Sequence, residues 1–163
     1  MKRIICVLLV ILSCLGLCAC GKEKVATAPH TYEDITIQLP EDFIDLSDEA
    51  FASDLVFIQG KDPIAVNGLR EEKALFESYG LELDLLRYAK LVVLSNNLTM
   101  QPEEKDGVLT FSYEAVTDGV SYTYVVTLWE TKDAYWTVQA YCPTADYQKV
   151  KNDIWEILSS VTV

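Results

Sequence analysis

The chain has 163 residues, of which 25 are acidic and 13 are basic, and half of its residues are hydrophobic. The formal net charge of −12 argues against nucleic acid as a partner, because contact with phosphates requires a basic surface. The roughly 130 residues that follow a short N-terminal region are enough for one hydrophobic core. We therefore expect a single domain.

The first 20 residues carry the clearest pattern of the chain. Lys2 and Arg3 precede an apolar run over residues 4–19, which ends at Cys20. The run of 16 residues is shorter than the ~20 that a membrane-spanning helix needs, and its length is typical of a signal-peptide core. The final stretch, Leu17-Cys18-Ala19-Cys20, resembles the lipobox of bacterial lipoproteins, with Cys18 where Ala or Ser is usual.

The resemblance implies that residues 1–19 are a removed signal peptide and that Cys20 is lipidated. An ordinary secretory signal cleaved elsewhere is the alternative, but the small Ala19 and the polar residues from Gly21 onward favour a cut before Cys20. A diacylglyceryl group carries two acyl chains, which together hold a protein stably on a membrane. We expect an extracytoplasmic protein, anchored to the bacterial cell membrane through lipid on Cys20.

The positions of the cysteines agree with this expected location. Three of the five cysteines lie in residues 1–19 and Cys20 carries the lipid, so Cys142 is left without a partner for a disulfide. We expect Cys142 to be a buried, inert side chain, the alternative being a reactive thiol. Loss of Lys2 and Arg3 with the leader would leave 11 basic and 25 acidic residues, a net charge of −14.

The region after Cys20 predicts a tether and then a domain. Residues 21–31 mix Lys, Glu, Thr and Pro without an apolar period, so residues 20–31 are assigned to the lipidated cysteine and a flexible tether. Residues 32–163 are assigned to the folded domain. The only histidine of the chain, His30, falls in the tether and is expected to be solvated.

The first half of the domain predicts strands followed by helices. Alternation over residues 35–39 predicts a strand that stops at Pro40, with a turn into a loop over residues 41–45. A second short strand is expected over residues 55–59. Two helices should follow, one from Asn67 or Gly68 to about Ser78 and one over residues 82–96.

Residues 107–142 predict a three-stranded antiparallel meander. Asp118-Gly119 is a strong hairpin signal, and it sets the first register as Ala115 with Tyr122, Tyr113 with Tyr124, Phe111 with Val126 and Leu109 with Leu128. For the second turn, a two-residue loop at Lys132-Asp133 would place polar residues opposite apolar ones. A three-residue loop over 131–133 aligns apolar with apolar, pairing Leu128 with Trp136 and Tyr122 with Cys142, and it is the register we expect.

This register assigns the aromatic side chains to two faces. Tyr113, Tyr122, Tyr124 and Trp136 are expected in the core together with Cys142, a ligand cleft being the alternative. Trp129, Tyr135 and Tyr141 fall on the other face and are the expected contact residues, since exposed aromatics favour interfaces. After Pro143 a final helix should present a stripe formed by Tyr147, Val150, Ile154, Leu158 and Val161.

The order of these elements resembles a known family. A strand ending in Leu39-Pro40-Glu41-Asp42-Phe43, helices in the middle, the stretch Tyr135-Trp136-Thr137-Val138 in a meander and a last helix ending in Ile157-Leu158-Ser159-Ser160-Val161 are similar to the Mog1/PsbP-like fold of bacterial PsbP-like lipoproteins. The resemblance covers residues 32–163 and implies an α+β domain, an antiparallel sheet flanked by helices. It implies binding or assembly as the role and brings no catalytic residues with it.

Chemistry-bearing motifs are not found in the sequence. A Ser-His-acid triad needs a histidine in the fold, and no Gly-rich phosphate loop or His-Glu-x-x-His is present. No cofactor is implied. For a metal, the weak candidates are Asp42, Asp45, Asp48 and Glu49, which crowd one loop without the spacing of a calcium loop. We expect a non-catalytic binding or assembly module with a protein partner in the cell envelope, the alternative being a receptor for a small ligand or cation.

Overall fold

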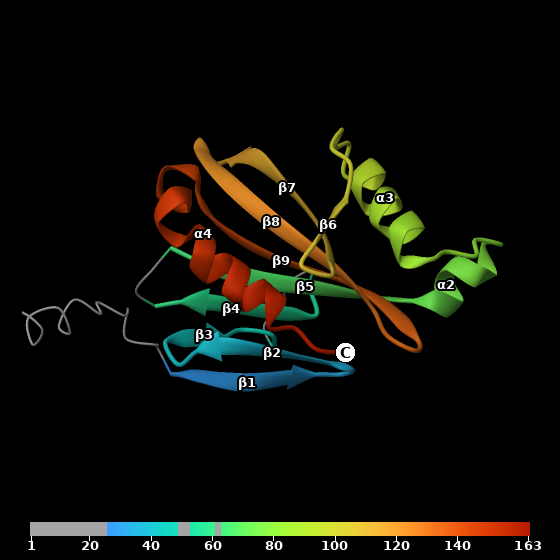
Figure 1. Ribbon diagram of the computed structural model, residues 1–163, viewed down its shortest axis with the longest axis horizontal. Helices are drawn as coiled ribbons and strands as arrows, with labels where there is room; N and C mark the ends of the chain where they lie inside the picture. The colour runs from blue at the N-terminus through green and yellow to red at the C-terminus, as the bar shows by residue number, and fades with distance from the viewer. Residues whose placement is uncertain (1–25, 49–52, 61–62) are drawn as a thin grey trace, which may run out of the picture.

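The computed structural model describes residues 26–48, 53–60 and 63–163 (Figure 1). Cys20 and Glu49 lie outside these residues. The described elements follow in chain order as β1 (Thr27–Tyr32), β2 (Ile35–Pro40), β3 (Phe43–Asp45), β4 (Leu55–Gln59), β5 (Ala65–Glu72), α2 (Lys73–Ser78), α3 (Leu85–Ser95), β6 (Glu103–Lys105), β7 (Val108–Thr117), β8 (Val120–Glu130), β9 (Ala134–Pro143) and α4 (Thr144–Ser159).

A seven-stranded sheet in the order β3-β4-β5-β9-β8-β7-β6 forms the body of the fold, and β1 and β2 form a separate two-stranded sheet. All of these strands pair antiparallel. Helix α4 and the β1–β2 hairpin lie on one face of the large sheet, whereas α3 packs on the other (Figure 1). This arrangement is the predicted α+β fold, an antiparallel sheet flanked by helices.

Each face of the large sheet buries its own core. The core under α4 joins Ile37 of β2 to Trp136 and Cys142 of β9 and to Ile154 and Leu158 of α4. The core under α3 gathers Phe76, Tyr88, Ala89, Val93, Phe111, Val126, Leu128 and Tyr135. The central strands are therefore covered on both sides, which determines how their side chains alternate.

The helix predicted from residue 67 is wrong over its first half. Residues 65–72 form β5, and the helix begins only at Lys73. The backbone of Gly68 passes so close to Leu55 on β4 that an added Cβ would lie 2.9 Å from the Leu55 Cγ. Glycine also costs about 1 kcal/mol in a helix interior, so pairing with β4 and β9 prevails over helix formation here.

The tether ends earlier than residue 31, because residues 27–32 form β1. This strand pairs with β2 from Thr27 opposite Pro40 to Tyr32 opposite Ile35. His30 is consequently half-buried rather than solvated, with its ring 5.0 Å from the ring of Phe57 in an edge-on contact. Residues 43–45, predicted as loop, form β3.

The first hairpin of the meander has the predicted register, with Tyr113 opposite Tyr124 and Leu109 opposite Leu128. The second does not. Thr131 N–H donates to the Ala134 carbonyl at 2.9 Å, which closes a two-residue loop and places Leu128 opposite Thr137. The three-residue loop is wrong because it assumes one apolar face, whereas helices cover both faces of β8 and β9 and each face mixes apolar with polar residues.

Candidate functional site

The three predicted contact residues do not share one face. Trp129 lies directly opposite Trp136 on the α4 side of the sheet. It is half-buried against that core, and its indole N–H donates to Thr127 Oγ1 at 3.0 Å. Trp129 thus completes the packing beside α4 and presents only part of its ring to solvent.

Tyr135 lies on the other face and belongs to the core under α3. Its side chain is 3% exposed, its ring stacks on Tyr88 with centroids 4.5 Å apart, and its hydroxyl donates to the Leu83 carbonyl. Burial raises the pKa of the Tyr135 hydroxyl. A side chain so enclosed cannot be a contact residue for a partner.

Tyr141 is partly exposed, and it lies beside the three tyrosines expected in the core. The rings of Tyr113 and Tyr124 are stacked with centroids 4.7 Å apart, and those of Tyr124 and Tyr141 with centroids 4.9 Å apart. The rings of Tyr122 and Tyr141 are in an edge-on contact, with centroids 6.1 Å apart. All four are half-buried, and partial burial raises the pKa of Tyr113 and of Tyr141.

The stack is one end of a longer line of directly paired residues, which we call the tyrosine row. It consists of Ile44, Ile58, Ala65, Tyr141, Tyr124 and Tyr113 on β3, β4, β5, β9, β8 and β7. Ile44 is 56% exposed and Ile58 is 43% exposed. The row lies on the sheet face that also carries α3. The sequence held the signal for it, because the two-residue loop at Lys132-Asp133 places Tyr141 beside Tyr124.

Beside the tyrosine row a cavity of about 270 Å³ lies between the sheet and α3. Two carboxamides in direct register, Asn67 of β5 and Gln139 of β9, line it. Tyr113 donates to Gln139 Oε1 at 3.4 Å, and deeper in the core the Tyr88 hydroxyl donates to Glu71 Oε2 at 2.8 Å. The lining mixes neutral polar groups and the Glu71 carboxylate with apolar side chains, as small-molecule sites do.

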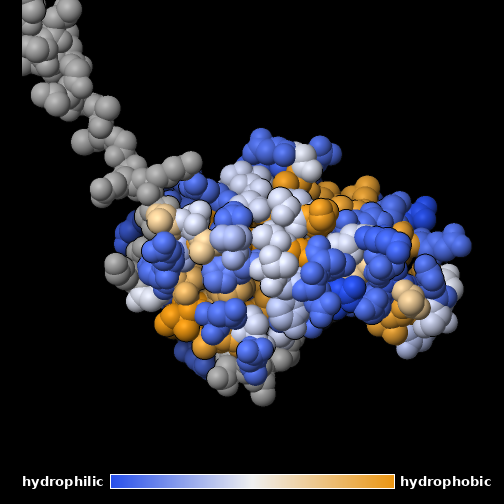
Figure 2. Space-filling view, turned by 90° about the horizontal axis from the view of Figure 1, so that it is seen from below, coloured by the Kyte–Doolittle hydropathy of each residue, from blue (hydrophilic) through white to orange (hydrophobic). Residues whose placement is uncertain are grey.

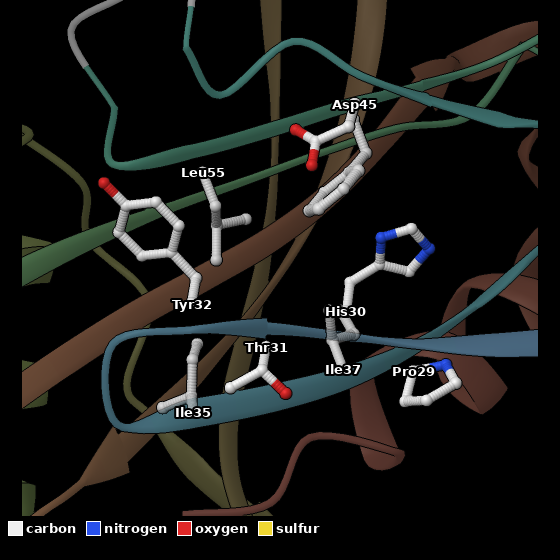
Figure 3. Close-up of a pocket in the computed structure, with 9 residues that line it drawn as sticks. Pro29, His30, Thr31, Tyr32, Ile35, Ile37, Asp45 and Leu55 are labelled. Carbon is white, nitrogen blue, oxygen red and sulfur yellow. The ribbon is translucent and has the colours of Figure 1, made fainter.

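A second cavity, of about 250 Å³, lies between the β1–β2 hairpin and the large sheet (Figure 3). Its apolar wall includes Leu55, Ile37 and Phe57, and His30 and Asp45 approach it from opposite sides (Figure 3). No ion pair joins His30 to Asp45 among the described residues. The Asp45 carboxylate instead accepts a hydrogen bond from the Ser47 N–H at 2.9 Å.

The weak metal candidates have separate local roles in the described part of the chain. Gln59 Nε2 donates to both carboxylate oxygens of Asp42 at 3.2 Å, and Asp48 is exposed. Among the described residues, no three His, Cys, Asp or Glu side chains are placed to hold one ion. The surface seen in Figure 2 is mostly hydrophilic, with separate hydrophobic areas.

Cys142 is buried in the core under α4, as predicted, although its partner across the strands is Thr123 and not Tyr122. It is a free thiol, and burial raises its pKa. None of the helices in residues 26–48, 53–60 and 63–163 is long and apolar enough to cross a membrane.

Comparison with known proteins bears on the fold. No family model matches the sequence, and no curated protein matches it. Among solved structures, the chain is similar to a PsbP protein of the cyanobacterium Synechocystis sp. PCC 6803, with a TM-score of 0.50 and 16% identity over 91% of this chain and 99% of that one. It is also similar to a mutant of the protein Mog1, with a TM-score of 0.54 and 14% identity over 85% and 96% of the two chains.

A third similar structure comes from Bacteroides thetaiotaomicron, with a TM-score of 0.53 and 10% identity over 80% of this chain. The chain spans 45% of the length of that protein. The domain therefore has a Mog1/PsbP-like α+β fold, as the order of its predicted elements indicates. At these identities the likeness concerns the fold, and function has to be argued from the surface of this chain.

Proposed function

We propose that the protein is a lipoprotein anchored outside the cell membrane through Cys20, where it acts as a non-catalytic binding or assembly module. The N-terminal pattern that ends at Cys20 supports the anchor. The tyrosine row supports the binding role, and it replaces Trp129 and Tyr135 as the contact surface. A protein partner in the cell envelope is the ligand class that fits such a surface.

The stack of Tyr113, Tyr124 and Tyr141 carries this proposal. Tyrosine is enriched in protein interfaces because its ring offers a large contact area and its hydroxyl offers a hydrogen bond. The three rings are fixed by mutual stacking across β7, β8 and β9, so contact with a partner would cost little side-chain entropy. Ile44 and Ile58 extend the apolar area along the row.

Site-specific photo-crosslinking in the producing bacterium tests the contact surface. A photoreactive amino acid at Tyr124 of the full chain should yield a crosslinked product of discrete mass, and the Tyr141→Ala substitution in the same chain should abolish it. The same amino acid at Glu156, which is exposed on α4, is the matched control. Equal products from both positions, or none from Tyr124, would refute the tyrosine row as the contact surface.

Metabolic labelling tests the anchor. An alkyne-bearing palmitate should label the chain in cells, and Cys20→Ser should abolish both the label and membrane association. Cys18→Ser is the matched control, because it changes the neighbouring cysteine of the same motif and should keep both. Label that survives in the Cys20→Ser chain would contradict the proposed anchor.

The cavity between the sheet and α3 favours one alternative function, that of a receptor for a small ligand. Asn67 and Gln139 offer amide donors and acceptors beside apolar walls in a space of about 270 Å³. The cation branch of this alternative rests on Asp42, Asp45, Asp48 and Glu49. Calorimetry with Ca²⁺ decides that branch, since a titration to millimolar ion that releases no heat would remove it.

A further inference from the structure

The outer edge of β7 is paired with another strand over only part of its length. Strand β6 pairs with β7 only from Val108 to Thr110, so within the described part of the chain Phe111–Thr117 pairs with a strand on the β8 side alone (Figure 1). Seven residues of an edge strand are enough to accept another strand, since the usual strand has five or six residues.

The turns of the two hairpins that include β7 determine the direction in which each of its backbone N–H and C=O groups points. Thr117 and Val120 flank the two-residue turn at Asp118-Gly119, so Thr117 and every second residue before it bond to β8. Lys105 and Val108 flank the turn on the other side, which directs Val108 and Thr110 toward β6. The N–H and C=O groups of Ser112, Glu114 and Val116 therefore point outward, and no hydrogen bond among the described residues engages them.

The side chains along this edge define what would fit it. Tyr113, the last residue of the tyrosine row, lies on one face of β7, so an added strand would continue the row with an apolar side chain next to Tyr113. Glu114 is exposed on the other face. Glu103, Glu104 and Lys105 of β6 lie at one end of the open edge and Asp118 of the turn lies at the other, and of these residues only Lys105 is basic. An acidic edge on a chain of net charge −12 favours a cationic occupant.

We propose that β7 binds an extended, lysine- or arginine-bearing segment of a partner protein as an additional strand of the sheet. Main-chain hydrogen bonds to Ser112, Glu114 and Val116 supply the affinity, and Glu114 and Tyr113 select cationic and apolar side chains at alternate positions. A second copy of this chain is the competing occupant, and its own net charge opposes it. This inference rests on the proposed binding function and names the chemistry of its partner.

Backbone amide exchange of the intact protein in detergent, measured by NMR, tests the proposal with a synthetic peptide of sequence Thr-Lys-Tyr-Lys-Val-Lys. In the free protein the amides of Ser112, Glu114 and Val116 should exchange fast. Saturating peptide should slow all three at least tenfold and leave the already protected amides of Tyr113 and Ala115 unchanged. Alternate protection of this kind is a signature of strand addition, which side-chain binding alone does not produce.

Matched probes separate strand addition from charge attraction. A peptide with Glu at each Lys position, and a Lys peptide N-methylated on alternate amides, should each bind at least tenfold more weakly. Glu114→Pro removes one outward donor and leaves the β8 ladder intact, so it should weaken binding similarly. Glu114→Lys, which keeps the backbone donor, should bind the Glu peptide better than the Lys peptide.

Three results would overturn the inference. They are unprotected amides at millimolar Lys peptide, binding that N-methylation leaves unchanged, and protection of β7 that arises from dimers in the absence of peptide. The proposed function fails separately, by its own crosslinking test at Tyr124. A crosslinked partner together with an unprotected β7 would leave the binding function standing and remove this edge as its site.

Discussion

The indole N–H of Trp136 donates to Asp34 Oδ1 at 2.7 Å, across 102 residues of sequence. Asp34 lies in the turn between β1 and β2, and Trp136 is a fully buried residue of β9. Arg70 Nε of β5 donates to the same carboxylate oxygen at 3.3 Å. One carboxylate therefore fastens the small hairpin to two strands of the large sheet.

The Asp34 contact predicts a pH-dependent stability. Burial alone would raise the pKa of Asp34, but hydrogen bonds from Thr131, Trp136 and Arg70 outweigh it and lower the pKa from 3.8 to about 2. A lowered folded-state pKa adds stability that is complete above the unfolded-state pKa and is lost as the pH falls through about 2.

Asp34→Asn should accordingly reduce the free energy of unfolding at pH 7 by about 1.5–3 kcal/mol, the usual range for a hydrogen bond to a charged group. Urea unfolding between pH 7 and pH 2.5 should show the difference from the unmutated chain shrinking below about pH 4. Asp48→Asn, at an exposed position, is the control and should change little. A difference that stays constant across this range would contradict the role of the ionised carboxylate.

Gly68→Ala should destabilise the protein by about 1–3 kcal/mol, because the new methyl group would overlap Leu55. Leu55 is 1% exposed and has little room to move. Thermal unfolding of the two single variants and of Gly68→Ala combined with Leu55→Ala measures the coupling. The double variant should lose less stability than the sum of the two single losses, and strict additivity would show that no overlap exists.

The stack of Tyr124 on Tyr141 should contribute measurable pairwise energy. Aromatic pairs of this geometry are worth about 0.5–1.5 kcal/mol beyond the area they bury. A double-mutant cycle with Tyr124→Leu and Tyr141→Leu, followed by urea unfolding, should give a coupling energy in that range. Tyr122 pairs with Ala115 across the strands and not with Tyr113, so a comparison cycle with Tyr122→Leu and Tyr113→Leu should give a smaller coupling.

Cys142 should be unreactive while the protein is folded. Burial encloses the thiol in the core under α4 and raises its pKa, so little thiolate forms at neutral pH. Iodoacetamide followed by mass spectrometry should leave Cys142 unmodified in buffer at pH 8 and alkylate it fully in 6 M urea, the concentration being about that of complete unfolding for small domains. Rapid alkylation of the folded protein would indicate an exposed thiol.

Local signals in the sequence predict most of the fold correctly. The strand at residues 35–39, the helix near 82–96 and the Asp118-Gly119 hairpin all depend on short-range patterns, and the structure confirms each of them. The order of these elements also indicates the Mog1/PsbP-like fold.

The wrong predictions concern segments whose structure depends on contacts with residues far away in the sequence. β5 forms because its residues pair with β4 and β9, and β9 comes about 70 residues later. The register of β9 depends on which faces helices cover, and residues 131–133 contain no sign of this. That single register error placed Tyr135 and Tyr141 on the face opposite Tyr124, whereas in the structure Tyr141 lies directly beside Tyr124.

The start of β1 at Thr27 limits the distance between the folded domain and a lipid attached to Cys20. Six residues, 21–26, separate that cysteine from Thr27, and a fully extended chain of six residues spans about 20 Å. If the anchor is as proposed, the β1–β2 hairpin is held next to the lipid headgroups. β7 lies on the opposite side of the molecule (Figure 1), so its open edge would face away from the bilayer, toward segments that extend out from neighbouring envelope proteins.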